Sequence, residues 1–194
     1  MKPEEFEAFV LENQHSLINY VTHLTRSRER AEEIAQDAFV RFYRNMERCR
    51  DNERLTPYLF RIATNLVVTQ IRRDQRWKRI LPLFKVMQPT SATPSDRPLM
   101  TGEIQKKVTA ALEQLPLKFR APLVLFEIEE WSYDAIARAL DCRIGTVKSR
   151  ISRARKLMRV QLESWWIGGN DDGRTDWQGP AATAASRSIA TLQV

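Results

Sequence analysis

The chain has 194 residues, of which 43% are hydrophobic, and a formal net charge of +7. This length and apolar content suit one or two small domains, and the positive charge favours an anionic partner. The sequence has no secretory signal and no apolar run of ~18 residues, which argues against export and against a membrane span. We therefore expect a cytoplasmic protein.

Residue patterns typical of catalysis or metal binding are missing from the sequence. Cys49 and Cys142 are the only cysteines, and neither has a His at ligand spacing, so we expect reduced thiols rather than a zinc site or a disulfide. No Gly-rich phosphate loop and no nucleophile–base pair is recognisable. We expect no metal, no cofactor and no enzymatic activity.

The first two predicted elements are amphipathic helices. One begins at Pro3, because proline is tolerated where the first amides of a helix have no internal partner. The other follows Ser27, a candidate N-cap, and is predicted to end near Arg48. Its apolar residues recur at helical spacing and are Ala31, Ile34, Ala35, Ala38 and Phe42.

The outer face of this second helix carries Gln36, Asp37 and Arg41. Asp37 and Arg41 are four residues apart, so they can form an ion pair within the helix. The sequence alone favours this explanation over a binding surface, because such a pair requires no partner molecule.

A third helix is predicted after a polar loop, with Thr56 as its cap and Pro57 as its first residue. Its apolar stripe consists of Leu59, Ile62, Ala63, Leu66 and Val67. The helix continues into a basic segment, whose arginines are either solvated or bind a polyanion. Trp77 lies within this segment and is either a ring for stacking on a base or a buried anchor.

Residues 81–101 are rich in Pro, Ser and Thr and have no sustained period, which predicts a flexible linker. The second domain is predicted to open with a helix that Pro116 stops. The next helix is expected to start near Phe119, which would place Pro122 in its tolerant first turn.

A helix-turn-helix pattern follows. A short helix is predicted from Tyr133 to Leu140, with Ser132 as its N-cap, and the turn DCRIG connects it to a basic helix. The basic helix runs from Arg143 to Arg159 and contains seven Lys or Arg and no acid.

The basic helix has two different faces at ~3.6 residues per turn. Its apolar face consists of Val147, Ile151, Ala154 and Met158. The opposite face holds Ser149, Ser152, Arg153 and Lys156, with Lys148 beside it. Solvated surface is the ordinary explanation for a basic run, but such surfaces normally alternate in sign. A helix without acids repels itself until an anion binds, which favours DNA binding.

The segments SYDAIARAL and GTVKSRISRAR resemble region four of bacterial sigma factors of the extracytoplasmic-function (ECF) type. In that family this module binds the minus-35 promoter element in the major groove. The resemblance implies minus-35 DNA contacts by Thr146, Lys148, Ser149, Ser152, Arg153 and Lys156. Asp141 departs from the glycine common at its position, although Asp tolerates left-handed geometry. Ser152 replaces a larger side chain, which leaves the base preference open.

The segments AEEIAQDAFVRFYRN and LTPYLFRIATNLVVTQIRR are similar to region two of the same family. In the family the first segment docks on the largest subunit of RNA polymerase, which implies this role for Gln36, Asp37 and Arg41. The second segment takes the minus-10 element as a single strand with a flipped base. The resemblance implies a base contact by Asn65, and the other implied strand contacts are Arg61, Arg72, Arg73 and Trp77.

We predict an all-α protein with a region-two domain over 1–80, the flexible linker, and a winged-helix-like helix-turn-helix domain over 102–167. Residues 168–194 are predicted to be a disordered tail, and the sequence assigns no role to Trp165, Trp166 and Trp177. The resemblance implies a sigma factor whose partners are core RNA polymerase, promoter DNA and an anti-sigma factor. The alternatives are a helix-turn-helix regulator without sigma activity and a basic RNA-binding or membrane-surface protein.

Overall fold

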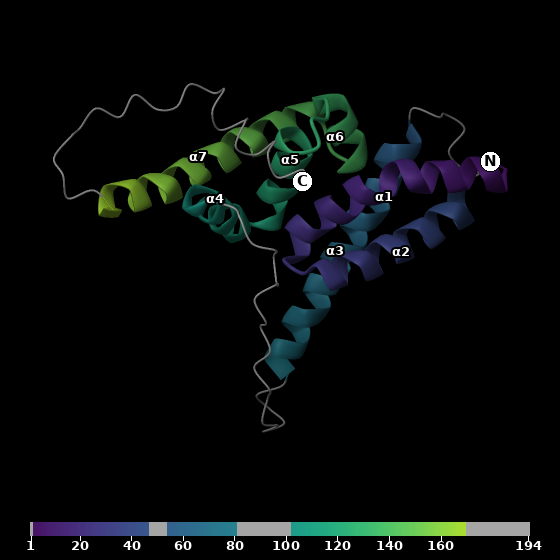
Figure 1. Ribbon diagram of the computed structural model, residues 1–194, viewed down its shortest axis with the longest axis horizontal. Coiled ribbons are helices and arrows are strands. Elements are labelled where there is room, and N and C mark those ends of the chain that lie inside the picture. Colours follow the sequence, from purple (N-terminus) through teal and green to yellow (C-terminus); the bar gives the residue numbers. More distant parts are fainter. Residues whose placement is uncertain (1, 47–53, 81–101, 170–194) are drawn as a thin grey trace. The chain divides into compact units, whose positions relative to one another are not determined.

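The computed structural model describes residues 2–46, 54–80 and 102–169 (Figure 1). Within these ranges the chain forms seven helices and no strand, which confirms the all-α class. The chain divides into two compact units, of which the first consists of α1 to α3 and the second holds α4, α5, α7 and most of α6. No helix in the described ranges has the length and apolar character needed to cross a membrane. The predicted linker over 81–101 lies outside the described residues.

The first two helices begin where the sequence indicates. α1 spans Pro3–Thr25 with Pro3 in its first turn, and α2 spans Arg28–Asn45. Arg26 lies between them in the left-handed region with φ 65°, and its N–H donates to the Thr22 carbonyl at 2.8 Å. The Ser27 side chain accepts the Arg30 N–H at 3.3 Å and caps α2, as predicted. This tight reversal packs α2 against α1.

One predicted boundary in this unit is wrong and another is close. α2 ends at Asn45, within three residues of the end that the sequence placed near Arg48. The third helix, α3, spans Leu55–Ile80, so Thr56 lies inside the helix and is not its cap. Pro57 still lies in the first turn, where its missing amide costs no hydrogen bond.

One apolar core holds α1, α2 and α3 together. Its largest fully buried side chains are Leu17, Tyr20, Phe42, Leu59 and Phe60. Complete burial of each aliphatic or Phe side chain contributes about 1.5–3 kcal/mol. The Tyr20 hydroxyl lies 2.9 Å from the Thr64 hydroxyl, so its polar group is hydrogen-bonded inside the core. An ion pair of 3.3 Å between Arg30 and Asp74 joins α2 to α3 at the surface.

The second unit contains α4 (Glu103–Gln114), α5 (Leu117–Glu127), α6 (Tyr133–Ala139) and α7 (Ile144–Gly169). α4 ends before Pro116, as predicted. α5 begins directly after this proline and not near Phe119, because the Pro116 carbonyl already accepts the N–H groups of Phe119 and Arg120 at 2.9 and 3.0 Å. Pro122 therefore lies inside α5, beyond the first turn, and the expectation for its position is wrong.

A buried arginine connects α4 to α5. Arg120 Nη2 donates to the carbonyl of Glu113 at 2.6 Å and to that of Leu115 at 2.7 Å. These carbonyls lie at the C-terminal end of α4, where helix carbonyls lack internal donors. Arg120 therefore has a structural role that its charge alone does not reveal.

The helix-turn-helix forms as the sequence predicts. Ser132 Oγ accepts the Ala135 N–H at 3.2 Å and caps α6. Asp141 adopts a left-handed conformation with φ 49° in the turn before α7. Val147, Ile151 and Ala154 are buried on the inner face of α7, which packs on α4 and α5. The opposite face of α7 is exposed.

Candidate nucleic-acid interface

The outer face of α7 presents the side chains predicted to contact DNA. Lys148, Ser149, Ser152, Arg153 and Lys156 are all exposed. Thr146 is half-buried in the first turn, where its carbonyl accepts the Ser149 hydroxyl at 3.0 Å. The structure therefore brings five of the six predicted residues to one open surface and leaves Thr146 at its edge.

The cations of this surface have little competition from carboxylates. Among the described residues, the ion pair of α7 runs from Arg155 to Glu127 and leaves Lys148, Arg153 and Lys156 without an acidic partner. Unpaired surface cations stay fully available to phosphates, and they repel one another when no anion is bound. The electrostatics of α7 therefore favour a polyanion.

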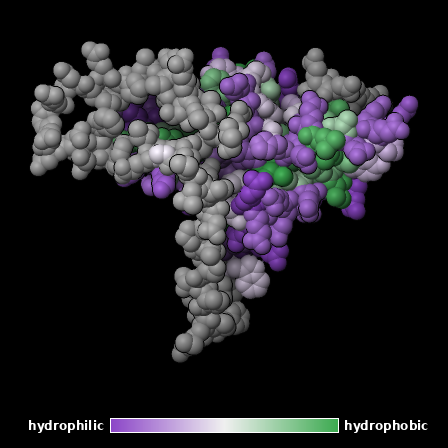
Figure 2. All heavy atoms as spheres, in the orientation of Figure 1, coloured by the Kyte–Doolittle hydropathy of each residue, from purple (hydrophilic) through white to green (hydrophobic). Residues whose placement is uncertain are grey.

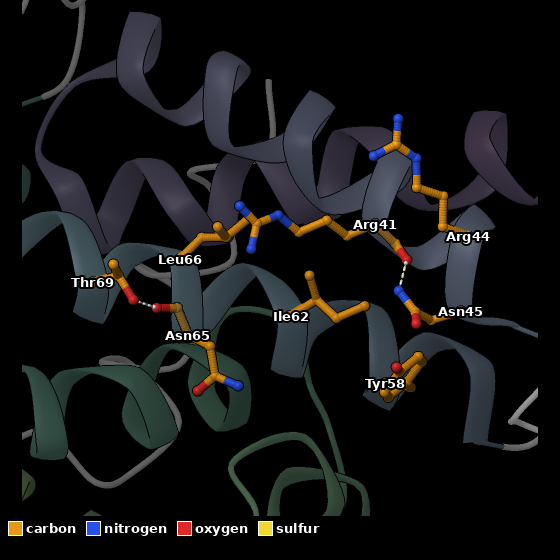
Figure 3. A pocket seen from close by; sticks show the side chains of 8 residues that line it. All are labelled: Arg41, Arg44, Asn45, Tyr58, Ile62, Asn65, Leu66 and Thr69. Carbon is orange, nitrogen blue, oxygen red and sulfur yellow. Dashed lines mark hydrogen bonds between the residues drawn. The ribbon is translucent and has the colours of Figure 1, made fainter.

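In the first unit, a hollow of about 540 Å³ lies between α2 and α3 (Figure 3). Its lining consists of Arg41, Arg44, Asn45, Tyr58, Ile62, Asn65, Leu66 and Thr69. The lining combines two guanidinium groups, an aromatic ring, amides and two aliphatic side chains. Such a mixture suits a nucleotide, which has a flat base and an anionic phosphate.

Asn65 lies at the rim of this hollow. In Figure 3 its amide extends away from Arg41 and Arg44, and the dashed bond at this residue joins its backbone carbonyl to Thr69. That bond, from the Thr69 hydroxyl, is 2.8 Å long. The Asn65 side chain is exposed and has no hydrogen bond to the described residues. The alternative that this amide bonds the preceding loop concerns residues 47–53, which lie outside the described ranges.

The other predicted strand contacts follow along α3. Arg72 and Arg73 are exposed, whereas Arg61 is half-buried and already engaged with other protein groups. The Trp77 side chain is 53% exposed, so the alternative of a buried anchor is wrong and its ring is accessible for stacking. The one acid in this stretch, Asp74, pairs with Arg30.

The predicted polymerase-binding residues lie on α2. Gln36, Asp37 and Arg41 are exposed, and no ion pair joins Asp37 to Arg41 among the described residues. The intrahelical explanation for these two charges is therefore not supported. Arg41 also lines the hollow, so it lies nearer to Asn65 than its sequence position indicates.

Sequence reasoning missed two exposed apolar residues of α2. Val40 is 49% exposed and Tyr43 is 46% exposed. Hydrophobic side chains are visible at the surface over α1 and α2 in Figure 2. Val40 lies four residues after Gln36, and Tyr43 lies three residues after Val40, so all three share one face of the helix. This helical spacing is the signal that would have found them. Tyr58 in the hollow had no such signal, because the hollow forms only when α2 packs on α3.

The thiol and metal predictions are tested only in part. Cys142 is a free thiol, and burial raises its pKa above the ordinary value. Cys49 lies outside the described residues. Among the described residues, no group of three or more His, Cys, Asp or Glu is placed to hold a metal ion.

Two family models match the chain in the order that the sequence analysis expected. The Sigma-70 region 2 model matches residues 9–77, and the Sigma-70 region 4 model matches residues 105–158. The first match covers α2, α3 and the hollow, and the second covers the helix-turn-helix. A simple helix-turn-helix regulator does not need the first module, so the matches argue against that alternative.

Sequence relatives and a solved structure point to the same family as the two family models. The chain is 30% identical over 166 residues to the RNA polymerase sigma-H factor of Pseudomonas aeruginosa, covering 81% of this chain and 86% of the relative. It is 33% identical over 141 residues to the ECF RNA polymerase sigma factor SigW of Bacillus subtilis, covering 68% and 75%. The sigma factor RpoE from Bartonella quintana, solved in complex with the anti-sigma factor NepR, superposes with a TM-score of 0.66 at 25% identity, covering 82% of this chain and 98% of that one.

These relatives are sigma factors, which are DNA-binding regulators of transcription initiation and not enzymes. Both modules of such proteins are present here, in the same order and with the helix-turn-helix in the second. The chain belongs to the ECF type of the sigma-70 family of RNA polymerase sigma factors.

Proposed function

We propose that this protein is a cytoplasmic promoter-specificity subunit that binds core RNA polymerase, recognises the minus-35 element through α7 and melts the minus-10 element through α3. The observation that carries the proposal is the presence of two separate exposed surfaces, one on α3 and one on α7, in the two matched modules. A repressor or activator that only binds duplex DNA requires the second surface alone.

For the minus-35 element, Lys148, Ser149, Ser152, Arg153 and Lys156 are the proposed contacts, with Thr146 at the edge. Their exposure and the absence of acids on this face support the assignment. A helix of this width fits the major groove of B-DNA, where Arg and Lys read guanine and contact phosphates.

For the minus-10 element, Asn65 is the proposed reader of a flipped base, and Arg61, Arg72, Arg73 and Trp77 are the proposed strand contacts. Two observations support this assignment: the Asn65 side chain is exposed with no hydrogen bond to the described residues, and the Trp77 ring is exposed. Stacking on an aromatic ring contributes about 1–3 kcal/mol per base and does not depend on sequence. The single strand therefore follows α3 from the hollow towards its basic C-terminal segment.

For polymerase, the proposed docking surface consists of Gln36, Asp37 and Arg41. The exposed apolar side chains of Val40 and Tyr43 beside them support a protein partner, because interfaces combine apolar anchors with polar groups. RpoE of Bartonella quintana was solved with an anti-sigma factor, and we propose that an anti-sigma factor also regulates this chain.

The test is reconstitution with core RNA polymerase. The protein should co-purify with core polymerase and should direct run-off transcription from promoters that core polymerase alone ignores. Binding to duplex DNA without association with polymerase would support a simple regulator and would overturn the proposal.

A further inference from the structure

Four side chains from three helices of the second unit form a continuous set of ring and cation contacts. Phe126 of α5 and Tyr133 of α6 are stacked, with ring centroids 4.9 Å apart and an interplanar angle of 5°. The Lys148 ammonium lies 5.7 Å from the Tyr133 centroid, and the Arg155 guanidinium carbon lies 5.2 Å from the Phe126 centroid. Each ring of the stacked pair therefore has its own cation from α7.

The spacing on α7 explains how one helix supplies both cations. Lys148 and Arg155 are seven residues apart, which is about two turns, so both side chains leave the same side of the helix. The stacked rings come from the end of α5 and the start of α6, which a short turn brings together. The contacts therefore connect all three helices around the start of α7.

The two cations of this set, Arg155 and Lys148, differ in whether they form an ion pair. Arg155 Nε and Nη2 both donate to Glu127 Oε1, at 2.8 and 2.5 Å, and the Glu127 side chain is only 17% exposed. The Arg155 guanidinium is therefore held by an intramolecular ion pair with Glu127. Lys148 has the Tyr133 ring but no carboxylate among the described residues, and it lies on the open face of α7.

We propose that the Phe126–Tyr133 pair is a positioning platform that holds the Lys148 side chain in the orientation that contacts DNA, with Arg155 and Glu127 fixing the far end. This inference rests on the proposed role of α7 in minus-35 binding. A lysine loses rotamer freedom when it contacts a phosphate. Contact with the ring removes part of that freedom before DNA arrives, while the three ammonium donors stay free to turn towards a phosphate.

The expected effect is moderate and is specific to Lys148. A cation over an aromatic ring at an exposed site contributes an interaction equivalent to about a two- to fivefold change in affinity. Tyr133→Leu should lower DNA affinity by this factor, because leucine preserves apolar packing but has no negatively polarised face. Tyr133→Phe should leave affinity unchanged, because it retains that face.

The experiment measures coupling between residues 133 and 148. Full-length Tyr133→Leu, Tyr133→Phe, Lys148→Ala and the Tyr133→Leu/Lys148→Ala double variant are titrated onto a labelled duplex that the wild-type protein has enriched from a random pool, and fluorescence anisotropy reports binding. Tyr133→Leu should weaken DNA binding when Lys148 is present. It should have no further effect on DNA binding when Lys148 is already replaced by Ala. Circular dichroism checks that helix content and melting are preserved.

Each outcome decides a different point. An equal loss in both backgrounds would show that Tyr133 affects binding independently of Lys148, and no loss in either would show that the platform does not position Lys148; both overturn the inference. No loss from Lys148→Ala itself would overturn the DNA contact by Lys148 and the platform with it. If Tyr133→Leu does not fold, pentafluorophenylalanine at position 133 replaces it, because this residue keeps the ring volume but reverses the charge of its face.

Discussion

The salt dependence of DNA binding should change by a predictable amount when the cations of α7 are removed. Lys148, Arg153 and Lys156 are exposed and have no carboxylate partner among the described residues. Each cation that contacts a phosphate contributes about −0.9 to the slope of log K against log salt concentration. Replacing all three with Gln should therefore make the slope shallower by up to about 2.7.

The assay is fluorescence anisotropy of the full-length protein on one duplex over a series of salt concentrations. Lys106→Gln is the matched control, because Lys106 is an exposed cation on α4 and does not belong to the outer face of α7. It should leave the slope almost unchanged. A slope that changes equally per charge removed in both variants would mean that net charge alone drives binding, and the assignment of the α7 surface would then be wrong.

Three further predictions concern docking, folding and thiol chemistry. Asp37→Arg should reduce retention of core polymerase in a pull-down and leave thermal unfolding unchanged, because Asp37 is exposed and makes no ion pair with Arg41; normal retention would count against the docking surface. Ser27→Ala should lower the free energy of unfolding by about 1 kcal/mol, as measured by urea denaturation, because it removes the N-cap of α2, and an unchanged midpoint would contradict that role. In a Cys49→Ser variant, Cys142 should react with iodoacetamide more slowly at neutral pH than free cysteine does. Burial raises the pKa of the Cys142 thiol and so lowers its thiolate fraction. A rate equal to or faster than that of free cysteine would refute this prediction.

Local signals in the sequence predicted most of the fold, because they act within a few residues of one another. Ser27 and Ser132 cap their helices, and the buried face of α7 follows directly from helical spacing. Asp141 is left-handed at the turn position where the resemblance implied a glycine-like conformation. These features depend on backbone geometry and periodicity, which a single sequence contains.

Features that depend on packing could not be predicted in the same way. Pro122 lies inside α5 because Pro116 starts that helix earlier than the apolar pattern indicates. The hollow beside Asn65 needs α2 and α3 in contact, so Tyr58 had no signal in the sequence. The same is true of Arg120, whose hydrogen bonds to the end of α4 are visible only in three dimensions.

Promoter melting is the most direct test of the central claim. Permanganate footprinting compares holoenzyme reconstituted with the wild-type chain and holoenzyme with Asn65→Ala, whose exposed side chain lies outside the core. Unstacking a base costs a few kcal/mol, so loss of the contact that receives it should be evident at this step. We predict reactive thymines near the minus-10 element for the wild type and strongly reduced reactivity for Asn65→Ala, with core binding unchanged. Equal reactivity in the two holoenzymes would contradict the role of Asn65, and no reactive thymines with the wild type would contradict the assignment of promoter melting to this protein.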